Sequence, residues 1–147
     1  IFLSEPDLEA HNHRLNAKYA AICEREQRAD AFWCDDADVV LIACNTPAQL
    51  AKSAIAELRG KGLKVGLFRP ITLWPFPIEH LLPFLPRTKR LVVVEASSGQ
   101  LEDEMRLALS HAGVHAPPPI SHVRRMGGIL PQQCEIVQHV LGLEEVH

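Results

Sequence analysis

Cys44 is the residue of this chain whose position most favours chemistry. It follows an apolar run expected to be a strand and precedes an expected helix, whose dipole can lower the pKa of a thiol. The flanking residues do not complete a known thiol site. Leu50 stands where a tyrosine phosphatase has arginine, and Pro47 where a thioredoxin-type pair has its second cysteine. We interpret Cys44 as a structural thiol and keep a thiol enzyme using Cys44 as an alternative.

Carboxylates and histidines offer a second kind of chemistry. Glu95 ends an expected strand and could act as an acid or base, but a carboxylate before a helix also has a structural role. Asp35-Asp36 precedes a strand, so we interpret it as a solvated turn. His111 and His115 have i, i+4 spacing, but a glycine between them makes a helical metal site doubtful. The sequence therefore predicts no catalytic residue and no metal site.

Glycine-rich phosphate loops are absent from the expected strand ends. The turn Cys44-Asn45-Thr46 contains no glycine, which excludes a dinucleotide fingerprint and a P-loop there. Gly127-Gly128 follows Arg124-Arg125, where an anion could bind, but a plain turn is the simpler interpretation. We expect no cofactor to be bound by this chain alone.

Composition indicates one globular domain. The 147 residues suffice for one core. A net charge of -3 argues against a nucleic-acid or membrane-surface partner, and no apolar run reaches the roughly 20 residues of a membrane span. The four cysteines lack metal or redox spacing, so we expect reduced thiols in a cytoplasmic protein. Because the sequence lacks an initiator Met, we expect a piece of a longer protein or a processed product.

Strand and helix patterns alternate along the chain. Residues 1–30 are predicted to be an N-terminal helix (4–28, capped by Ser4) and linker, and residues 31–147 an α/β domain. Strands are predicted at 38–43, 64–68, 90–95 and 120–123, and helices at 47–61, 78–82, 100–111 and 131–141. The apolar runs in the strands are typical of parallel strands covered on both faces. We therefore expect a doubly wound, mostly parallel sheet with helices on both faces.

Helical spacing also predicts which side chains of two helices face the core. In the helix at 100–111 these are Leu101, Met105, Leu107, Ala108 and Leu109. In the helix at 131–141 they are Cys134, Val137 and Leu141.

The stretch from Lys64 to Pro77 combines a short strand with a very apolar turn. Arg69-Pro70 is expected to end the strand, because proline cannot donate to a sheet ladder. Trp74 and Phe76 then alternate with prolines that stiffen the backbone. Such a loop either folds back on its own sheet or lies against a partner.

Three stretches together resemble one family. They are Val-Gly-Leu-Phe-Arg-Pro-Ile-Thr-Leu-Trp-Pro-Phe-Pro at 65–77, Val-Val-Val-Glu at 92–95 with Gly-Gln-Leu at 99–101, and Gly-Gly-Ile-Leu-Pro at 127–131. In order and spacing they are similar to the C-terminal part of the alpha subunit of 2-oxoacid:ferredoxin oxidoreductases, of the 2-oxoglutarate or branched-chain 2-oxoacid type. The resemblance implies a transketolase C-terminal-domain-like fold.

The resemblance also implies the activity of a parent complex. A 2-oxoacid and coenzyme A would give acyl-CoA and carbon dioxide, and ferredoxin would take the electrons. Thiamine diphosphate, magnesium and iron–sulfur clusters would lie elsewhere in that complex. Its implied partners for this chain are an upstream domain of the same alpha subunit and a beta subunit, in a homo- or hetero-oligomer.

Two hypotheses follow besides the thiol enzyme. In the first, the chain is a non-catalytic assembly and support domain, inactive alone. Its predicted interface residues are Arg69, Thr72, Leu73, Trp74, Phe76 and Gln100. In the second, it is a stand-alone flavodoxin-like module that binds a small molecule beyond the carboxyl ends of its strands. That site would lie near Asn45, Thr46, Ser97 and Ser98.

Overall fold

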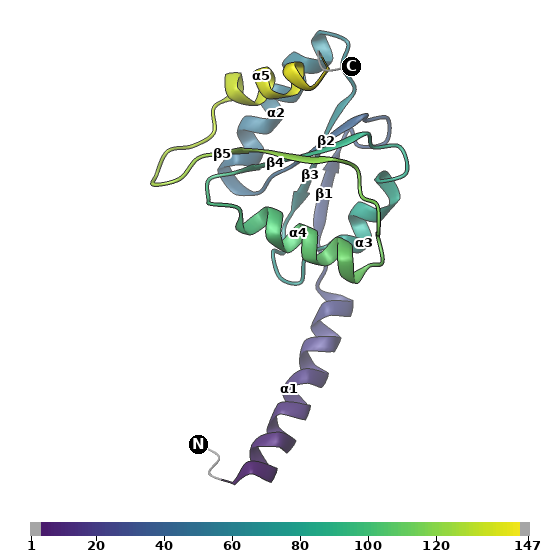
Figure 1. The fold of residues 1–147 in the computed structure, drawn as a ribbon, viewed down its shortest axis with the longest axis vertical. Coiled ribbons are helices and arrows are strands. Elements are labelled where there is room, and N and C mark those ends of the chain that lie inside the picture. Colours follow the sequence, from purple (N-terminus) through teal and green to yellow (C-terminus); the bar gives the residue numbers. More distant parts are fainter. Residues whose placement is uncertain (1–3, 145–147) are drawn as a thin grey trace.

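The computed structural model describes residues 4–144, which form a five-stranded sheet between two layers of helices and a helix that extends away from it (Figure 1). The strand order is β1-β3-β2-β4-β5. β1 pairs antiparallel with β3, and the other pairs are parallel. The elements are α1 (Glu5–Arg25), β1 (Ala29–Phe32), β2 (Val39–Ile42), α2 (Asn45–Gly60), β3 (Val65–Pro70), α3 (Ile78–Leu81), the 3-10 helix η1 (Leu82–Phe84), β4 (Arg90–Glu95), α4 (Gln100–His111), β5 (Ile120–Arg124) and α5 (Gln133–Glu144). The predicted α/β class with a doubly wound, mostly parallel sheet is confirmed.

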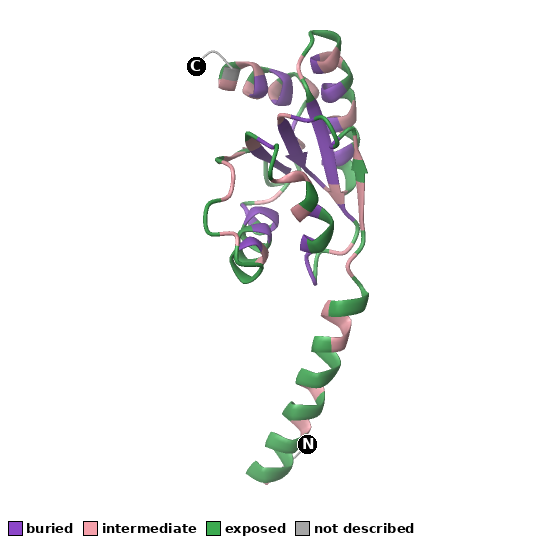
Figure 2. Cartoon of the chain, turned by 90° about the vertical axis from the view of Figure 1, so that its right-hand side faces the viewer, coloured by how far each residue is buried: buried purple, intermediate pink, exposed green. Residues whose placement is uncertain are grey.

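Side-chain alternation along the strands divides the core in two. In β2, Val39 and Leu41 lie in the cluster that contains the buried faces of α2 and α5. Val40 and Ile42 lie in the cluster that contains those of α3 and α4. Figure 2 shows the buried strands between these layers. Because helices cover both faces of the sheet, every side chain of β2 is buried, which explains why its sequence is apolar throughout.

α4 has the predicted bounds but a narrower buried face. Leu101, Met105 and Leu109 are buried, at i, i+4 and i+8. Leu107 was predicted to face the core, but it is 51% exposed because it lies on the opposite side of the helix.

α5 uses partly different core residues from those predicted. Val137 is buried as expected, whereas Cys134 is exposed. Ile136 and Val140 are fully buried and pack against α2 and the sheet.

β1 is a strand that was not predicted from the sequence. This strand pairs with β3 from Ala29 opposite Pro70 to Phe32 opposite Leu67. β3 consequently continues to Pro70, beyond its predicted end, because β1 supplies a further row of partners. The predicted boundary between residues 30 and 31 falls within β1.

α1 begins as predicted. Its cap is Ser4, whose hydroxyl accepts a hydrogen bond from the amide of Asp7 at 3.4 Å. None of the residues of α1 is buried, and the helix extends away from the sheet (Figures 1 and 2).

Candidate functional site

The loop after β3 holds the segment between α1 and β1. The amide of Arg28 donates to the hydroxyl of Thr72 at 3.0 Å. The carbonyl of Arg28 accepts from the amides of Ile71 and Thr72 at 2.9 and 3.2 Å. Arg69 forms an ion pair of 3.0 Å with Asp30 in β1. We call residues 27–30 and 69–80 together the clasp.

Gln27 adds side-chain contacts to the clasp. Its Oε1 accepts from the amide of Glu79 at 3.0 Å, and its Nε2 donates to the carbonyl of Cys23 at 3.1 Å. The carbonyl of Gln27 lies 3.0 Å from Nε2 of His80. The clasp therefore fixes the direction in which α1 leaves the sheet.

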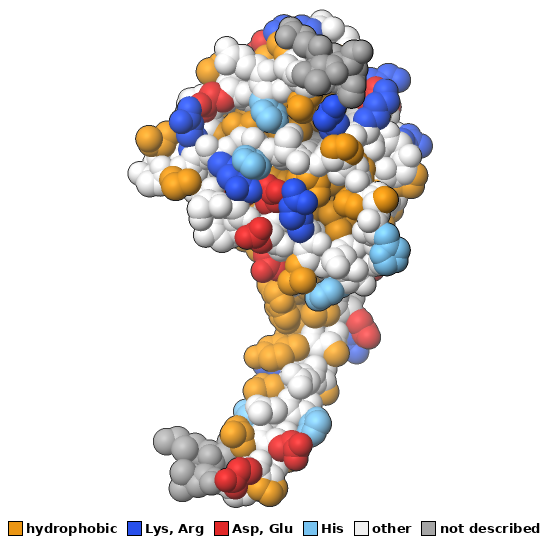
Figure 3. Space-filling model, in the orientation of Figure 1, with side chains coloured by type: hydrophobic (Ala, Val, Ile, Leu, Met, Phe, Trp, Pro, Cys, Tyr) orange, Lys and Arg blue, Asp and Glu red, His pale blue; other side chains and the backbone are white. Residues whose placement is uncertain are grey.

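Trp74 extends the clasp onto α1. Its ring meets the ring of Tyr19 edge to face. Tyr19 is 46% exposed and Trp74 is 55% exposed, so each offers further apolar area to a partner. Figure 3 shows hydrophobic side chains along one side of α1 and at its junction with the domain.

Phe76 lies in a different environment from the other predicted interface residues. Its side chain is 5% exposed and its ring centroid is 6.2 Å from that of Phe68 in β3. Phe76 therefore supports the loop from beneath and offers almost no docking surface.

A crevice of about 360 Å³ opens at the carboxyl edge of the sheet. Asn45 and Thr46 line it at the start of α2, and Ser97 lines it after β4. Leu73 and Gln100, both predicted for the interface, also border it. Three of the four residues predicted for a ligand site thus line one crevice, and Ser98 is not among its lining residues.

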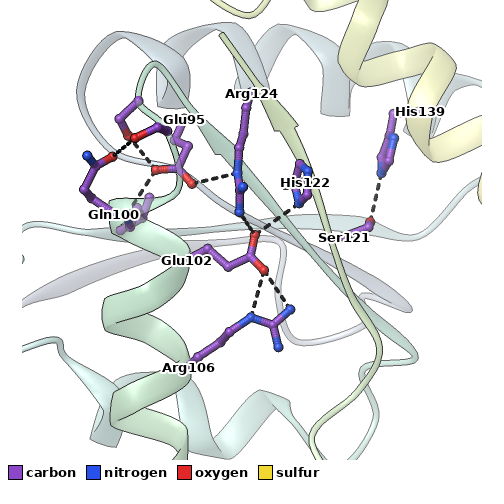
Figure 4. Close-up of polar contacts among 11 residues, drawn as sticks. Glu95, Gln100, Glu102, Arg106, Ser121, His122, Arg124 and His139 are labelled. Atoms are coloured by element: carbon purple, nitrogen blue, oxygen red, sulfur yellow. Dashed lines mark hydrogen bonds and ion pairs between the residues drawn. The ribbon is translucent and has the colours of Figure 1, made fainter. Parts of the chain in front are cut away.

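Glu95 lies at the base of this crevice with its carboxylate already engaged (Figure 4). It is 3% exposed, and its Oε2 accepts from the hydroxyl of Ser97 at 2.5 Å and from the amide of Leu101 at 3.1 Å. Its Oε1 lies 3.4 Å from Nε of Arg124. Glu95 therefore accepts a hydrogen bond from a backbone amide in the first turn of α4. This is the structural role of a carboxylate before a helix, not the role of an acid or base.

Arg124 continues the network to a second buried carboxylate. Its guanidinium also pairs with Glu102, which accepts a hydrogen bond of 2.8 Å from Nε of Arg106 and lies 3.2 Å from Nδ1 of His122 (Figure 4). Burial tends to raise the pKa of Glu102, but the hydrogen bonds from Arg106 and Arg124 outweigh burial, so the pKa is lowered. This network joins α4 to β4 and β5.

Gly99 makes room for Arg124. A Cβ atom at position 99 would lie 3.1 Å from the guanidinium carbon, and the backbone there has a φ of 124°. Only glycine adopts such a conformation without strain.

Cys44 is not activated in this structure. Burial and the nearby charge of Glu95 raise the pKa of its thiol, although Cys44 is the N-cap residue of α2. The thiol-enzyme alternative requires a lowered pKa, so the structure opposes it.

The other candidate sites considered from the sequence are an anion site before Gly127 and a metal site. Arg124 and Arg125 pair with carboxylates, Arg125 with Glu135, so the turn before Gly127 is not a free anion site. Among residues 4–144, no three His, Cys, Asp or Glu side chains are grouped to hold a metal ion. Within the same range no helix is long and apolar enough to cross a membrane.

Sequence reasoning missed Gln27, Arg28 and Glu102. Gln27 acts mainly through its side-chain amide and Arg28 through its backbone amide and carbonyl, and both depend on a chain reversal that composition does not reveal. Glu102 lies in the first turn of α4, where an acidic residue is expected, but spacing gives no indication of its pairing with Arg124.

The fold class follows from comparison with solved structures. A 2-oxoglutarate:ferredoxin oxidoreductase from Magnetococcus marinus, solved with 2-oxoglutarate, coenzyme A and succinyl-CoA bound, matches 99% of this chain and 24% of its own, with a TM-score of 0.76 and 24% identity. A split-gene transketolase, described as an inactive beta4 tetramer, matches 78% of this chain and 40% of its own, with a TM-score of 0.64 and 20% identity. The chain has the predicted transketolase C-terminal-like fold.

Sequence comparison identifies the family. Residues 37–136 match the family described as pyruvate:ferredoxin oxidoreductase core domain II, and the chain belongs to it. The ketoisovalerate oxidoreductase subunit VorB of Methanothermobacter marburgensis is 38% identical over 140 residues, which cover 95% of this chain and 38% of VorB. The chain thus spans well under half the length of that relative. The predicted relationship to 2-oxoacid:ferredoxin oxidoreductase subunits is confirmed.

Proposed function

We propose that this chain is a non-catalytic assembly and support domain in the alpha-type subunit of a thiamine-diphosphate-dependent 2-oxoacid:ferredoxin oxidoreductase. The parent complex would convert a 2-oxoacid and coenzyme A to acyl-CoA and carbon dioxide while reducing ferredoxin. Family membership supports the parent complex. The clasp is the observation that supports an assembly role, because it fixes the direction of α1 and places Trp74 beside that helix.

The proposed contacts of this domain are with the upstream domain of the same subunit and with a beta subunit. α1 has no buried residue, whereas most helices gain their stability by packing one face against other elements. A partner covering Tyr19, Trp74 and the adjacent side of α1 would supply that packing. The four free cysteines fit a reduced, cytoplasmic location for the complex.

The described residues show no ready-made metal centre of such a complex. Among residues 4–144 no three His, Cys, Asp or Glu side chains are grouped to hold a metal ion, and the four cysteines form no cluster-binding set. We therefore propose that thiamine diphosphate and the iron–sulfur clusters are held by other domains or subunits.

Purification of the protein from its source cells through a C-terminal tag tests the proposal. Native mass spectrometry should find a longer alpha chain with a beta-type partner and thiamine diphosphate. The complex should reduce ferredoxin with 2-oxoisovalerate or 2-oxoglutarate when coenzyme A is present. A free chain of 16.4 kDa without this activity would overturn the proposal.

A further inference from the structure

The crevice at the carboxyl edge occupies the point where the sheet changes winding direction. β2 lies between β3 and β4. From β2 the chain passes through α2, over one face of the sheet, to β3 on one side of β2. From β4 it passes through α4, over the opposite face of the sheet, to β5 in the opposite direction along the strand order. The loops after β2 and β4 therefore diverge, and crevices at such switch points are where open α/β sheets bind ligands.

The dimensions and lining of the crevice suit a small molecule. Its volume of about 360 Å³ lies within the range of roughly 300 to 1,000 Å³ typical of ligand sites. Apolar walls come from Pro47, Leu73, Leu101 and Leu130. Asn45, at the start of α2, and Gln100, at the start of α4, also line it and offer amide groups that can fix the orientation of a ligand.

The charges around the crevice favour a cation. Glu104 borders the crevice, is exposed, and has no ion-pair partner in the part of the chain that the structure describes. No Lys or Arg is among the described lining residues. The nearby cations, Arg69 and Arg124, are each paired with a carboxylate. The N-termini of α2 and α4 each contribute about half a positive charge, but the carboxylate of Glu95 already lies at the start of α4, so the full negative charge of Glu104 exceeds what remains.

We propose that this crevice binds a small molecule with an apolar body and a protonated amine, with the amine held by Glu104 and the body enclosed between Leu73 and Leu101. The proposal does not depend on the assembly role: Leu73 belongs to both the clasp and the crevice, but the hydrogen bonds and the ion pair of the clasp are made by residues that do not line the crevice.

Titration of the ¹⁵N-labelled 147-residue chain with three probes of matched shape tests this. The probes are 2-phenylethylamine, 2-phenylethanol and 3-phenylpropionate. The amine should give saturable amide shifts at Asn45, Thr46, Ser97 and Leu101, with a dissociation constant at least tenfold lower than that of the carboxylate. The alcohol should have a dissociation constant between those of the amine and the carboxylate, because it keeps the apolar contact but carries no charge.

Two variants locate the site, and a third serves as the control. Glu104→Gln, at an exposed position, should reduce the preference for amine over carboxylate by about tenfold. Asp103→Asn, the adjacent exposed carboxylate outside the crevice, should leave that preference unchanged. Ala96→Leu places a larger side chain in the lining and should abolish saturable binding, while the amide spectrum elsewhere stays the same.

Other outcomes would overturn the proposal. Absence of saturable shifts with all three probes would remove the site. Tighter binding of 3-phenylpropionate would refute the amine class. Shifts confined to the hollow beside Trp74 and Leu107, which Glu104 also borders, would assign the amine to a different surface.

Discussion

The ring of Tyr19 meets the ring of Trp74 edge to face, with centroids 5.7 Å apart and planes at 87°. This contact ties α1 to the loop after β3, which also holds Arg28 through Thr72. Both residues remain about half exposed, so the pair both orients α1 and leaves an apolar surface beside it. Surfaces with exposed aromatic anchors are typical of protein interfaces.

Trp74→Ala should weaken assembly more than folding. The lost ring contact should lower the free energy of unfolding by about 1 kcal/mol. Loss of an interface tryptophan should weaken association of the complex by about 2 kcal/mol or more. Trp33→Ala is the matched control. Trp33 is equally exposed, but it follows the C-terminal end of β1, whereas the clasp lies at the N-terminal end of that strand. Chemical unfolding and native mass spectrometry measure the two effects, and unchanged association in Trp74→Ala would refute the docking role.

Arg124→Met should be strongly destabilising. It leaves Glu95 and Glu102 buried without their shared cation, and removal of one partner from a buried ion pair costs about 3 to 5 kcal/mol. Arg125→Met is the control, because its pair with Glu135 is partly exposed and should contribute less than about 1 kcal/mol. Urea unfolding compares them, and equal losses would contradict a bracing role for Arg124.

Gly99→Ala should destabilise the chain by about 1 to 3 kcal/mol through backbone strain and crowding of Arg124. Gly60→Ala gives the opposite expectation. Position 60 is helical and has open space for a Cβ atom, so alanine should be neutral or stabilising by up to about 1 kcal/mol. Thermal unfolding of the two variants tests the contrast, and a neutral Gly99→Ala would show that the close approach is not required.

The sequence predicts this fold well where one pattern has one structural solution. The β-branched apolar runs at 39–42 and 90–95 are typical of parallel strands covered on both faces, and the structure has such strands there. β1 escaped prediction because four residues of mixed polarity, Ala-Asp-Ala-Phe, become a strand only through pairing with β3.

The candidate site was predictable in position but less so in contacts. Asn45, Thr46 and Ser97 converge because the carboxyl ends of parallel strands share one edge. Trp74 was predicted to contact a partner, and the structure adds its contact with α1. The pairing of Arg124 with Glu95 and Glu102 depends on side-chain directions across three elements, which periodicity does not encode.

His139 should make stability depend on pH near neutrality. Burial and the positive charge of His122 lower the pKa of His139, whose Nε2 lies 2.8 Å from the hydroxyl of Ser121. The unfolded chain, with the ordinary pKa of about 6.5, then binds more protons as the pH falls. Stability should therefore decline as the pH falls through 6.5. His139→Gln should flatten this decline in urea unfolding between pH 7.5 and 5.5, whereas His13→Gln, at an exposed position on α1, should not.

Cysteine alkylation distinguishes a structural Cys44 from a reactive one. Cys134 is exposed on α5, whereas burial raises the pKa of Cys44 and raises that of Cys34 to about 11. Because only the thiolate reacts, iodoacetamide at pH 7.5 should modify Cys134 at least tenfold faster than Cys44, with Cys34 slowest. Peptide mass spectrometry over time gives the rates, and Cys134→Ser should remove the fast phase without changing the others. If Cys44 reacted first, the thiol would have to be activated by its position at the start of α2, and the thiol-enzyme alternative would regain support.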